Sequence, residues 1–180
     1  MIFKRIIYAL LYSNGNFHLS RNFRLQKVGD VEWLKNNFGF GETCDFIDEL
    51  MVINVTTDST EEDFKKYFED INKLREKIFV PITLGGGIRN LDHAKKCFNN
   101  GADKILINHL AHFDTDECKK ISNIYGEQAI SVMVDYKKDR NGFSTYTKSG
   151  TTFSKSLKDF IISIKKIKFG EIIMNSIDKD

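Results

Sequence analysis

Cysteine is scarce, long apolar runs are missing, and neither sign of charge dominates this chain of 180 residues. The three cysteines, Cys44, Cys97 and Cys118, have neither the paired spacing of a disulfide framework nor that of a metal site. A reducing compartment and no bound metal are therefore expected. No apolar run approaches the roughly 20 residues of a membrane-spanning helix, so we expect a cytoplasmic protein without a membrane partner.

The 27 basic residues nearly balance the 25 acidic ones, which gives a net charge of +2. This nearly even balance of charge argues against a nucleic-acid partner. Hydrophobic residues make up 41% and charged residues 29% of the chain, as is typical of a soluble globular protein. The length suits one domain with a buried core. No linker, low-complexity tract or cofactor is expected.

Short apolar runs alternate with segments of helical periodicity. The runs that predict strands are Arg5–Tyr12, Phe46–Val55, Phe79–Leu84, Lys104–Asn108, Ala129–Asp135 and Glu171–Ile177. Continuous apolar strands are typical of a parallel sheet that is covered on both faces. The sequence therefore predicts an α/β fold with a parallel sheet, either an open doubly wound sheet or a closed barrel.

Several helices are indicated by apolar residues at 3.6-residue spacing. The clearest runs from Phe64 to Ile78, and Ser59 or Thr60 can cap it. The apolar residues of the others are Val31, Leu34 and Phe38; Leu91, Ala94 and Phe98; and Leu157, Phe160, Ile161 and Ile164. The segment Tyr136–Ser154 interrupts the alternation, and its Asn141-Gly142 pair predicts a small β-ribbon.

A glycine-rich turn, Gly85–Gly87, follows a predicted strand and precedes a helix that opens near Asn90. Such a turn lets the backbone approach an anion closely, and N–H groups at the helix start can cradle a phosphate. The alternative is a tight turn that needs positive φ and binds nothing. The next strand ends in Asn108 and His109. Asn108 can donate to the same phosphate, while His109 is either a second donor or a polar rim residue.

Carboxylates stand at the C-terminal ends of two predicted strands. Asp135 closes one strand, and Asp178 and Asp180 follow the last one. In barrel enzymes this end carries the catalytic groups, and a carboxylate with a raised pKa can act there as general acid or base. The alternative for each aspartate is a helix cap or a loop tether.

Seven segments together resemble one enzyme family. They are KRIIYALL, FIDELMVINVT, VPITLGGGIR, GADKILIN, YGEQAISVMVD, TYTKSG and GEIIMNSIDKD, in this order. Over essentially its whole length the chain is similar to the cyclase subunit of imidazole glycerol phosphate synthase, and most similar to a divergent HisF-like (AglZ-type) branch. The resemblance implies a (β/α)8 barrel that receives ammonia from a glutaminase on its N-terminal face. A bis-phosphate substrate would bind on its C-terminal face.

The family's ammonia gate is a ring of four charged residues at the bottom of the barrel. The resemblance places this gate at Arg5, Glu49, Lys104 and Glu171. Buried charges are costly unless they pair, so two acids and two bases favour mutual pairing, whereas exposed strand starts would need none. Asp103 matches a family aspartate that faces the glutaminase.

The resemblance also assigns residues of the C-terminal face. One phosphate site corresponds to Gly85, Gly86, Gly87 and Asn108, with His109 in place of a family threonine. Polar active-site positions correspond to Asp135 and Asp180. The second phosphate site, which the loops after the last two strands build in the family, has no counterpart in these residues.

Other departures from the family concern catalysis. Leu11 stands where the histidine-pathway enzyme has its essential acid–base aspartate, and a leucine cannot transfer a proton. Leu19 replaces a lysine, with His18 beside it, and Asn54 replaces the aspartate that ends the second strand. The gate positions, by contrast, are kept.

This pattern favours a subunit that channels ammonia to a phosphorylated substrate or to an ATP-dependent sugar amidotransferase, for surface-polysaccharide sugar modification. The alternatives are a histidine-pathway cyclase with unusual substitutions and a non-catalytic partner that activates a glutaminase. A full barrel has eight strand–helix units, of which about six are recognisable here. We therefore expect residues 1–180 to form one domain that lacks the last two units and has two unpaired sheet edges.

Overall fold

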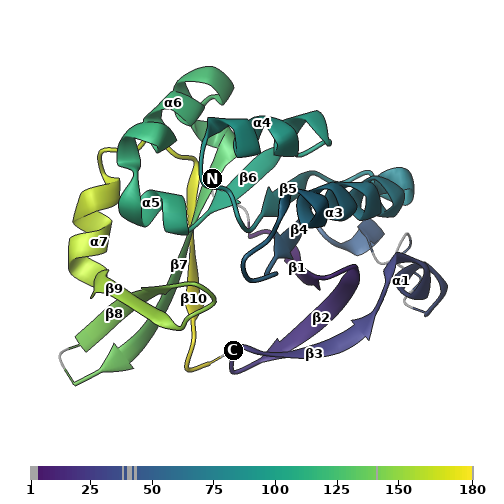
Figure 1. Cartoon of the computed structure of the whole chain (residues 1–180), viewed down its shortest axis with the longest axis horizontal. Coiled ribbons are helices and arrows are strands. Elements are labelled where there is room, and N and C mark those ends of the chain that lie inside the picture. Colours follow the sequence, from purple (N-terminus) through teal and green to yellow (C-terminus); the bar gives the residue numbers. More distant parts are fainter. Residues whose placement is uncertain (1–3, 38, 40–41, 43, 141, 180) are drawn as a thin grey trace.

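A computed structural model describes residues 4–37, 39, 42, 44–140 and 142–179. Its centre is a sheet of parallel strands, shown in Figure 1. Their spatial order is β1 (Ile7–Ser13), β4 (Glu49–Asn54), β5 (Ile82–Gly85), β6 (Lys104–Ile107), β7 (Ile130–Asp139) and β10 (Glu171–Ser176). Each predicted strand is present, and the predicted α/β class is confirmed.

Several strands begin later than the apolar runs predict. Cys44–Phe46 forms the 3-10 turn η1, β5 begins only at Ile82, and Arg5 precedes β1. Phe46 and Phe79 are 80% and 92% exposed. Their apolar character therefore does not reflect burial in the sheet.

The sheet does not close into a barrel. Among the described strands β10 pairs only with β7, and β1 pairs with β4 and, over its last residues, with β2. Ile172 and Met174 of β10 are 39% and 47% exposed. The succession of βα steps is that of an incomplete (β/α)8 barrel, in which eight parallel strands would complete the ring.

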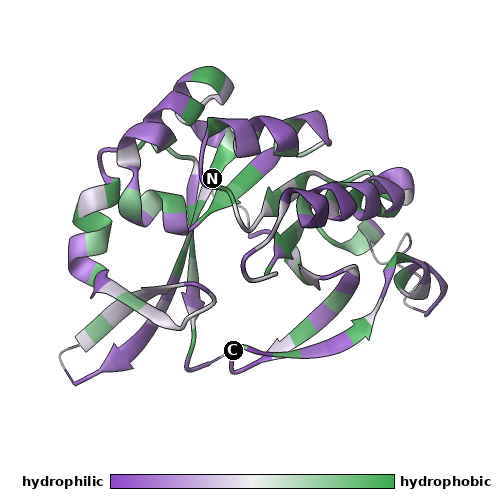
Figure 2. Cartoon of the chain, viewed as in Figure 1, coloured by the Kyte–Doolittle hydropathy of each residue, from purple (hydrophilic) through white to green (hydrophobic). Residues whose placement is uncertain are grey.

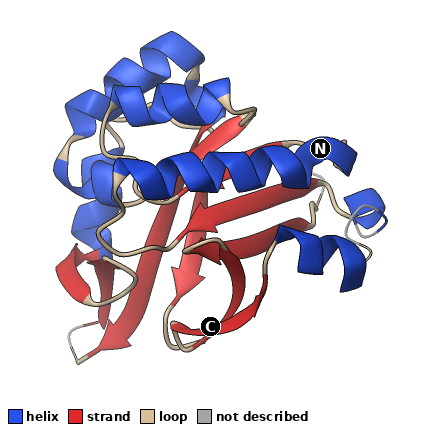
Figure 3. Ribbon diagram, turned by 45° about the vertical axis from the view of Figure 1, so that its right-hand side comes forward, coloured by secondary structure: helices blue, strands red, loops and turns tan. Residues whose placement is uncertain are grey.

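Helices cover one face of the sheet, as Figure 3 shows. They are α3 (Glu61–Leu74), α4 (Leu91–Asn99), α5 (His109–Phe113), α6 (Thr115–Tyr125) and α7 (Leu157–Ile164). A further helix, α1 (Val31–Asn37), precedes β4, and the 3-10 turns η2 (Arg75–Lys77) and η3 (Glu127–Ala129) precede β5 and β7. No helix of the described ranges is long and apolar enough to cross a membrane.

The predicted apolar stripes lie on these helices, with two differences. Ile78 falls beyond α3 and η2, and Phe38 lies outside the described residues. Thr60 rather than Ser59 caps α3, because its hydroxyl accepts the Asp63 N–H while the Asp63 carboxylate accepts the Thr60 N–H. Such a reciprocal cap fixes where the helix begins.

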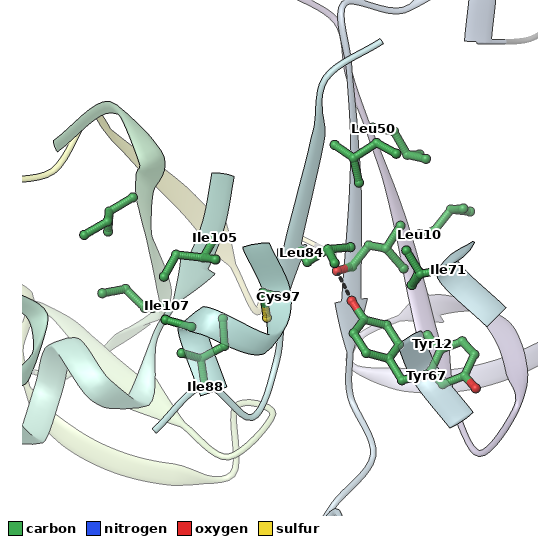
Figure 4. Close-up of a cluster of buried hydrophobic side chains, with 14 of the residues drawn as sticks. Leu10, Tyr12, Leu50, Tyr67, Ile71, Leu84, Ile88, Cys97, Ile105 and Ile107 are labelled. Atoms are coloured by element: carbon green, nitrogen blue, oxygen red, sulfur yellow. Dashed lines mark hydrogen bonds between the residues drawn. The ribbon is translucent and has the colours of Figure 1, made fainter. Parts of the chain in front are cut away.

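The helix-covered face of the sheet holds the hydrophobic core (Figure 4). Val52, Leu84 and Ile105 are 0% exposed and pack in one cluster with Tyr67 and Ile71 of α3. The Tyr67 hydroxyl donates to the backbone oxygen of Val52 at 2.9 Å, so its burial leaves no polar atom stranded. Figure 2 shows the same division, with hydrophobic strands beneath helices whose outer sides are hydrophilic.

The predicted ribbon is present in the connection between β7 and β10. It consists of the end of β7, β8 (Gly142–Thr147) and β9 (Thr152–Ser156), paired antiparallel. Asn141, part of the predicted turn, lies outside the described residues. The ribbon therefore extends β7 beyond Asp135, which the sequence places at the end of its strand.

A second hairpin, β2 (Asn16–Arg21) with β3 (Arg24–Gly29), is not predicted by the apolar pattern. Apolar residues are few in both strands, and β3 is mostly exposed, so the hairpin carries little hydrophobic signal. The available signal lies in two turns, Asn14-Gly15 between β1 and β2 and Asn22-Phe23 between β2 and β3, where all four residues have positive φ. Asn-Gly in particular is typical of a two-residue hairpin turn.

Candidate functional site

The N-terminal ends of the parallel strands bring four charged side chains together on the face opposite the helices. Arg5 binds Glu49 (Nη1–Oε2, 3.3 Å) and Glu171 (Nη2–Oε2, 2.5 Å). Lys104 Nζ binds the same two carboxylates, at 2.6 Å from Glu49 Oε2 and 2.9 Å from Glu171 Oε1. The four groups form a closed ring of alternating charge, which we call the charged layer.

Two hydroxyl groups complete the contacts of the layer. Thr83 of β5 donates to Glu49 Oε1 at 2.5 Å, and Ser131 of β7 donates to Glu171 Oε1 at 2.8 Å. Glu49 is 1% exposed, and both hydroxyl residues are 0% exposed. Each carboxylate therefore has donors on both oxygens, as a buried anion requires.

Opposing effects set the pKa of the Glu171 carboxyl group. Burial alone would raise this pKa, but hydrogen bonds from Lys104, Ser131 and Arg5 lower it to about 2. Burial would likewise lower the pKa of Lys104, whereas its bonds to the two carboxylates raise it. The hydrogen bond to Glu171 raises the pKa of Arg5. The ion pairs of Glu171 with Lys104 and Arg5 are therefore charged at neutral pH.

Exposed side chains surround the strand starts near this layer. Asp103 precedes β6, is exposed, and accepts the backbone N–H of Ile82 at 2.8 Å. Ile6, Phe46 and Phe79 precede β1, β4 and β5 and are 61%, 80% and 92% exposed. These three large apolar side chains thus lie exposed at or just before the starts of neighbouring strands.

At the opposite ends of the strands, two amide side chains hold Asp135. Asn108 Nδ2 donates to Oδ2 and Asn175 Nδ2 donates to Oδ1, each at 2.8 Å. Asp135 is 8% exposed and lies inside β7, so it is neither a helix cap nor the last residue of its strand. A carboxylate fixed by donors from two neighbouring strand ends is well placed for proton transfer or for binding a hydroxyl group.

The glycine-rich turn has a packing requirement of its own. Gly86 and Gly87 have φ of 89° and 71°. A Cβ on Gly86 would lie 1.8 Å from the backbone oxygen of Asn54, and one on Gly87 would lie 2.4 Å from the Phe64 ring. The turn therefore needs glycine whether or not it also binds an anion.

Two backbone amides in the first turn of α4, where the sequence predicts a phosphate cradle, have partners within the chain. The Leu91 N–H donates to the Glu117 carboxylate at 2.8 Å, and the His93 N–H donates to the Asn90 side chain at 2.9 Å. These helix-start amides are already satisfied within the chain, so a phosphate would have to use groups nearer the glycines.

Asn108 and His109 open α5 beside this turn. The Asn108 side chain gives an N–H to Asp135, and its Oδ1 is buried with no hydrogen-bond partner among the described residues. Burial lowers the pKa of His109, and the positive charges of Arg89 and Lys148 lower it further. Cationic side chains from two loops thus act on this one imidazole, an environment that favours an anionic ligand.

The residues that depart from the family occupy the same end of the sheet. Leu11 is half-buried in β1, opposite Ile53 and His18, so no proton-transfer group occupies its position. Leu19 is 57% exposed on β2, and Asn54 is buried. Among the described residues no group of three or more His, Cys, Asp or Glu side chains is placed to hold a metal ion.

Asp178 and Asp180 stand close to the C-terminal end of the chain. Asp178 accepts the Lys138 backbone N–H at 3.0 Å, which matches the alternative of a loop-tethering aspartate. Asp180, predicted as an active-site residue, lies outside the described residues.

Three polar strand residues without a marked sequence pattern contact the predicted ones. Thr83 and Ser131 bind the acids of the charged layer, and Asn175 binds Asp135. The signal for two of them was strand alternation, since residues separated by an even number share a face. Ser131 stands four residues before Asp135, and Asn175 stands four after Glu171.

Comparison with known sequences points to one family. A profile described as "Histidine biosynthesis protein" matches residues 44–180. A protein of Parasynechococcus marenigrum (strain WH8102), described provisionally as imidazole glycerol phosphate synthase subunit hisF2, is 39% identical over 178 residues. Imidazole glycerol phosphate synthase subunits HisF of Chlorobium chlorochromatii (strain CaD3) and Thermotoga sp. (strain RQ2) are 30% and 33% identical. The matches cover 98–100% of this chain, which spans only 65–70% of the length of these relatives.

Proposed function

Because the chain belongs to the histidine biosynthesis protein family, we propose that it acts as a HisF-like synthase subunit of a glutamine-dependent enzyme. It accepts ammonia from a glutaminase at the N-terminal ends of its strands and passes it to a phosphorylated substrate at their C-terminal ends. The charged layer carries this proposal. Burying charged groups for packing alone is costly, because an apolar residue would stabilise the same positions at least as well.

The charged layer has the properties that an ammonia entrance needs. Its members are unevenly accessible, since the side chain of Arg5 is 45% exposed, that of Lys104 18% and that of Glu49 1%. Ammonia is small and both donates and accepts hydrogen bonds, so it can replace one bond of the ring at a time. Larger polar molecules would have to break several ion pairs at once.

The surface around the layer supports a protein partner at this end. Phe46, Phe79 and Ile6 offer apolar area, and Asp103 adds a negative charge beside them. Apolar and aromatic side chains dominate the binding energy of protein interfaces, and charges set the orientation. We assign this surface to the glutaminase.

The opposite end has the groups for a substrate. Asp135 serves as a general acid or base, or holds a substrate hydroxyl, and the Asn108 amide fixes its position. The backbone of Gly85–Gly87, together with His109 and the neighbouring Arg89, receives a phosphate group. No metal or cofactor is needed for these roles.

Leu11 separates the candidate pathways. A histidine-pathway cyclase would need a proton-transfer group where this chain has Leu11, and losing one typically costs about 10²–10⁴-fold in rate. The identity of 39% to a hisF2 protein, against 30–33% to HisF subunits, also supports a divergent role. We therefore favour ammonia delivery for surface-sugar modification with an ATP-dependent sugar amidotransferase. A subunit that only activates its glutaminase is the second candidate, since Leu11 removes the same chemistry.

Nitrogen transfer from labelled glutamine tests the proposal. In a complex with a HisH-type glutaminase and its acceptor, Lys104→Met should leave glutamine hydrolysis running while less nitrogen reaches the product. Lys119→Met is the matched control, because Lys119 forms an exposed pair with Asp116 on α6. Equal coupling in both variants would remove the ammonia-entrance role. Stimulated hydrolysis without any aminated product would favour the activating subunit.

A further inference from the structure

All six parallel strands contribute to the charged layer, although only four of them bring a charge. Arg5 stands just before β1, and Glu49, Lys104 and Glu171 open β4, β6 and β10. The two remaining strands, β5 and β7, supply Thr83 and Ser131. The hydroxyl residues thus stand between the charged ones in the order of the sheet.

The two carboxylates receive the same set of donors. Each accepts one N–H from Arg5, one from Lys104 and one O–H from a hydroxyl residue. The two carboxylates differ in which oxygen accepts each bond. On Glu49, Oε1 accepts from Thr83 and Oε2 accepts from both cations. On Glu171, Oε1 accepts from both Ser131 and Lys104.

We propose that Ser131 and Thr83 are positioning residues of the ammonia entrance, whose hydroxyl groups clamp the two carboxylates and so keep the ring closed until a partner docks. This inference rests on the proposed function. It adds to the four charged residues a neutral part that decides how readily the ring opens.

A neutral donor suits this task better than another charge. The layer has two acids and two bases, so a third cation would leave an unbalanced buried charge. An apolar side chain would leave one carboxylate oxygen with fewer donors, and water cannot easily replace them at residues that are 0% exposed. A hydroxyl restrains each carboxylate without changing the charge balance.

Carbon-13 NMR titration of the Glu171 carboxyl group tests the clamp in the chain alone. Ser131→Ala should raise the pKa of this group by roughly one unit from its low value, because a donor to the charged form is lost. Arg5, Lys104 and Glu49 face the same group and are present in every variant. Ser131→Thr keeps the hydroxyl and should leave the pKa unchanged.

Ser122→Ala is the matched control, since Ser122 is 6% exposed and its hydroxyl donates to a helical carbonyl of α6. An unchanged Glu171 pKa in Ser131→Ala, or an equal shift in the control, would overturn the clamp. If Ser131→Ala does not fold, Ser131→Cys places a weaker donor at the same position, and a smaller upward shift is expected. Its absence would count equally against the clamp.

Coupling in the glutaminase complex separates this inference from the proposed function. Thr83→Val removes the other hydroxyl at nearly constant shape and, like Ser131→Ala, should raise the ratio of glutamine hydrolysed to nitrogen transferred. Normal coupling in both variants, with an intact wild-type complex, would overturn the gating role and leave the proposed function standing. If the wild-type chain binds and stimulates no glutaminase, the proposed function fails, and the gating role fails with it.

Discussion

At the N-terminal ends of the six strands each charged side chain of the layer meets opposite charges, whereas at the C-terminal ends neutral amides hold a single buried carboxylate. The first end contains Arg5, Glu49, Lys104 and Glu171 in mutual contact. At the second, Asn108 and Asn175 each donate to the carboxylate of Asp135. The same strands therefore carry a self-sufficient ionic cluster at one end and a hydrogen-bonded acid at the other.

The difference lies in what each end leaves for a ligand. In the charged layer each carboxylate has donors on both oxygens, so a ligand must displace an existing hydrogen bond. At the C-terminal end Asn108 Oδ1 has no partner among the described residues, and Arg89 and Lys148 act on His109. The first pattern is what we expect at an entrance that opens when a partner docks. The second is what we expect at a surface that receives an anionic substrate.

The largest effect is expected from breaking the charged layer. Lys104→Met leaves Glu49, which is 1% exposed, and Glu171 with only one cation between them. The free energy of unfolding should fall by about 3 kcal/mol, as measured by urea denaturation at pH 7. Adding Glu49→Gln restores the charge balance and should recover roughly 1 kcal/mol of it. A loss no larger than that of the exposed control Lys119→Met would show that the layer does not hold the fold.

Acid should loosen the C-terminal half first, through His112 of α5. His112 is 6% exposed, interacts with Ser154 Oγ at 2.9 Å and stacks on Phe160 with 3.9 Å between ring centroids. Burial, Lys155 and His109 lower its pKa to about 4. The unfolded chain therefore takes up the proton first, and stability present above about pH 6.5 is lost between pH 6.5 and 4.

The loss in this window should be about 2–3 kcal/mol in the wild-type chain. His112→Phe keeps an aromatic ring for Phe160 and removes the titrating group, so its stability should change much less over the same window. Free energies of unfolding at pH 7.5, 5.5 and 4.5 compare the two chains. Parallel curves would mean that His112 is not the source of acid sensitivity.

The charged layer should resist acid longer. The folded pKa of Glu171 is about 2, below its ordinary value of 4.5. Its contribution is therefore complete above about pH 4.5 and disappears as the pH falls toward 2. After allowance for solvent screening it amounts to about 2 kcal/mol. In Glu171→Gln this low-pH component should vanish, while the step between pH 6.5 and 4 remains; loss of both steps would contradict the separation of the two ends.

A smaller effect is expected where the two hairpins meet above the C-terminal end. Gly150 of the β8–β9 turn has φ of 75°, and a Cβ there would lie 3.0 Å from Phe23 Cδ1 and 3.2 Å from Ile177 Cδ1. Gly150→Ala should cost about 1–2 kcal/mol. Gly126→Ala is the control, because Gly126 has φ of 86° but nothing within 4 Å. Equal losses of thermal stability in the two variants would mean that backbone strain is the whole effect and that the Phe23 contact contributes nothing.

Strand alternation and family resemblance together anticipated much of this arrangement. Buried strands such as β4 and β6 are continuous apolar runs, so their places follow from hydrophobicity. The place of the β2–β3 hairpin does not follow in this way, because its strands have few apolar residues and only the adjoining turns carry a signal. Apolar character also misled at Phe46 and Phe79, which extend the predicted strands although both are exposed.

The residues of the charged layer could be predicted, but most of the contacts between them could not. Arg5 and Glu171 are 166 positions apart, and no local pattern pairs them without a fold in which strand starts meet. The roles of Thr83 and Ser131 could not be predicted, because a hydroxyl residue inside an apolar strand is common and marks no particular contact. The occupied start of α4 could not be foreseen either, since it depends on Glu117 reaching Leu91 from another helix.

The rate of glutamine hydrolysis by a HisH-type glutaminase, measured with and without this chain, tests the central claim most directly. We predict that the chain raises this rate and that Phe79→Ser at the N-terminal end abolishes the increase. Phe153→Ser, which changes an aromatic residue of the β8–β9 ribbon that is 60% exposed, should leave the increase intact. No stimulation by the wild-type chain, or equal loss in both variants, would contradict the assignment of the N-terminal end to a glutaminase.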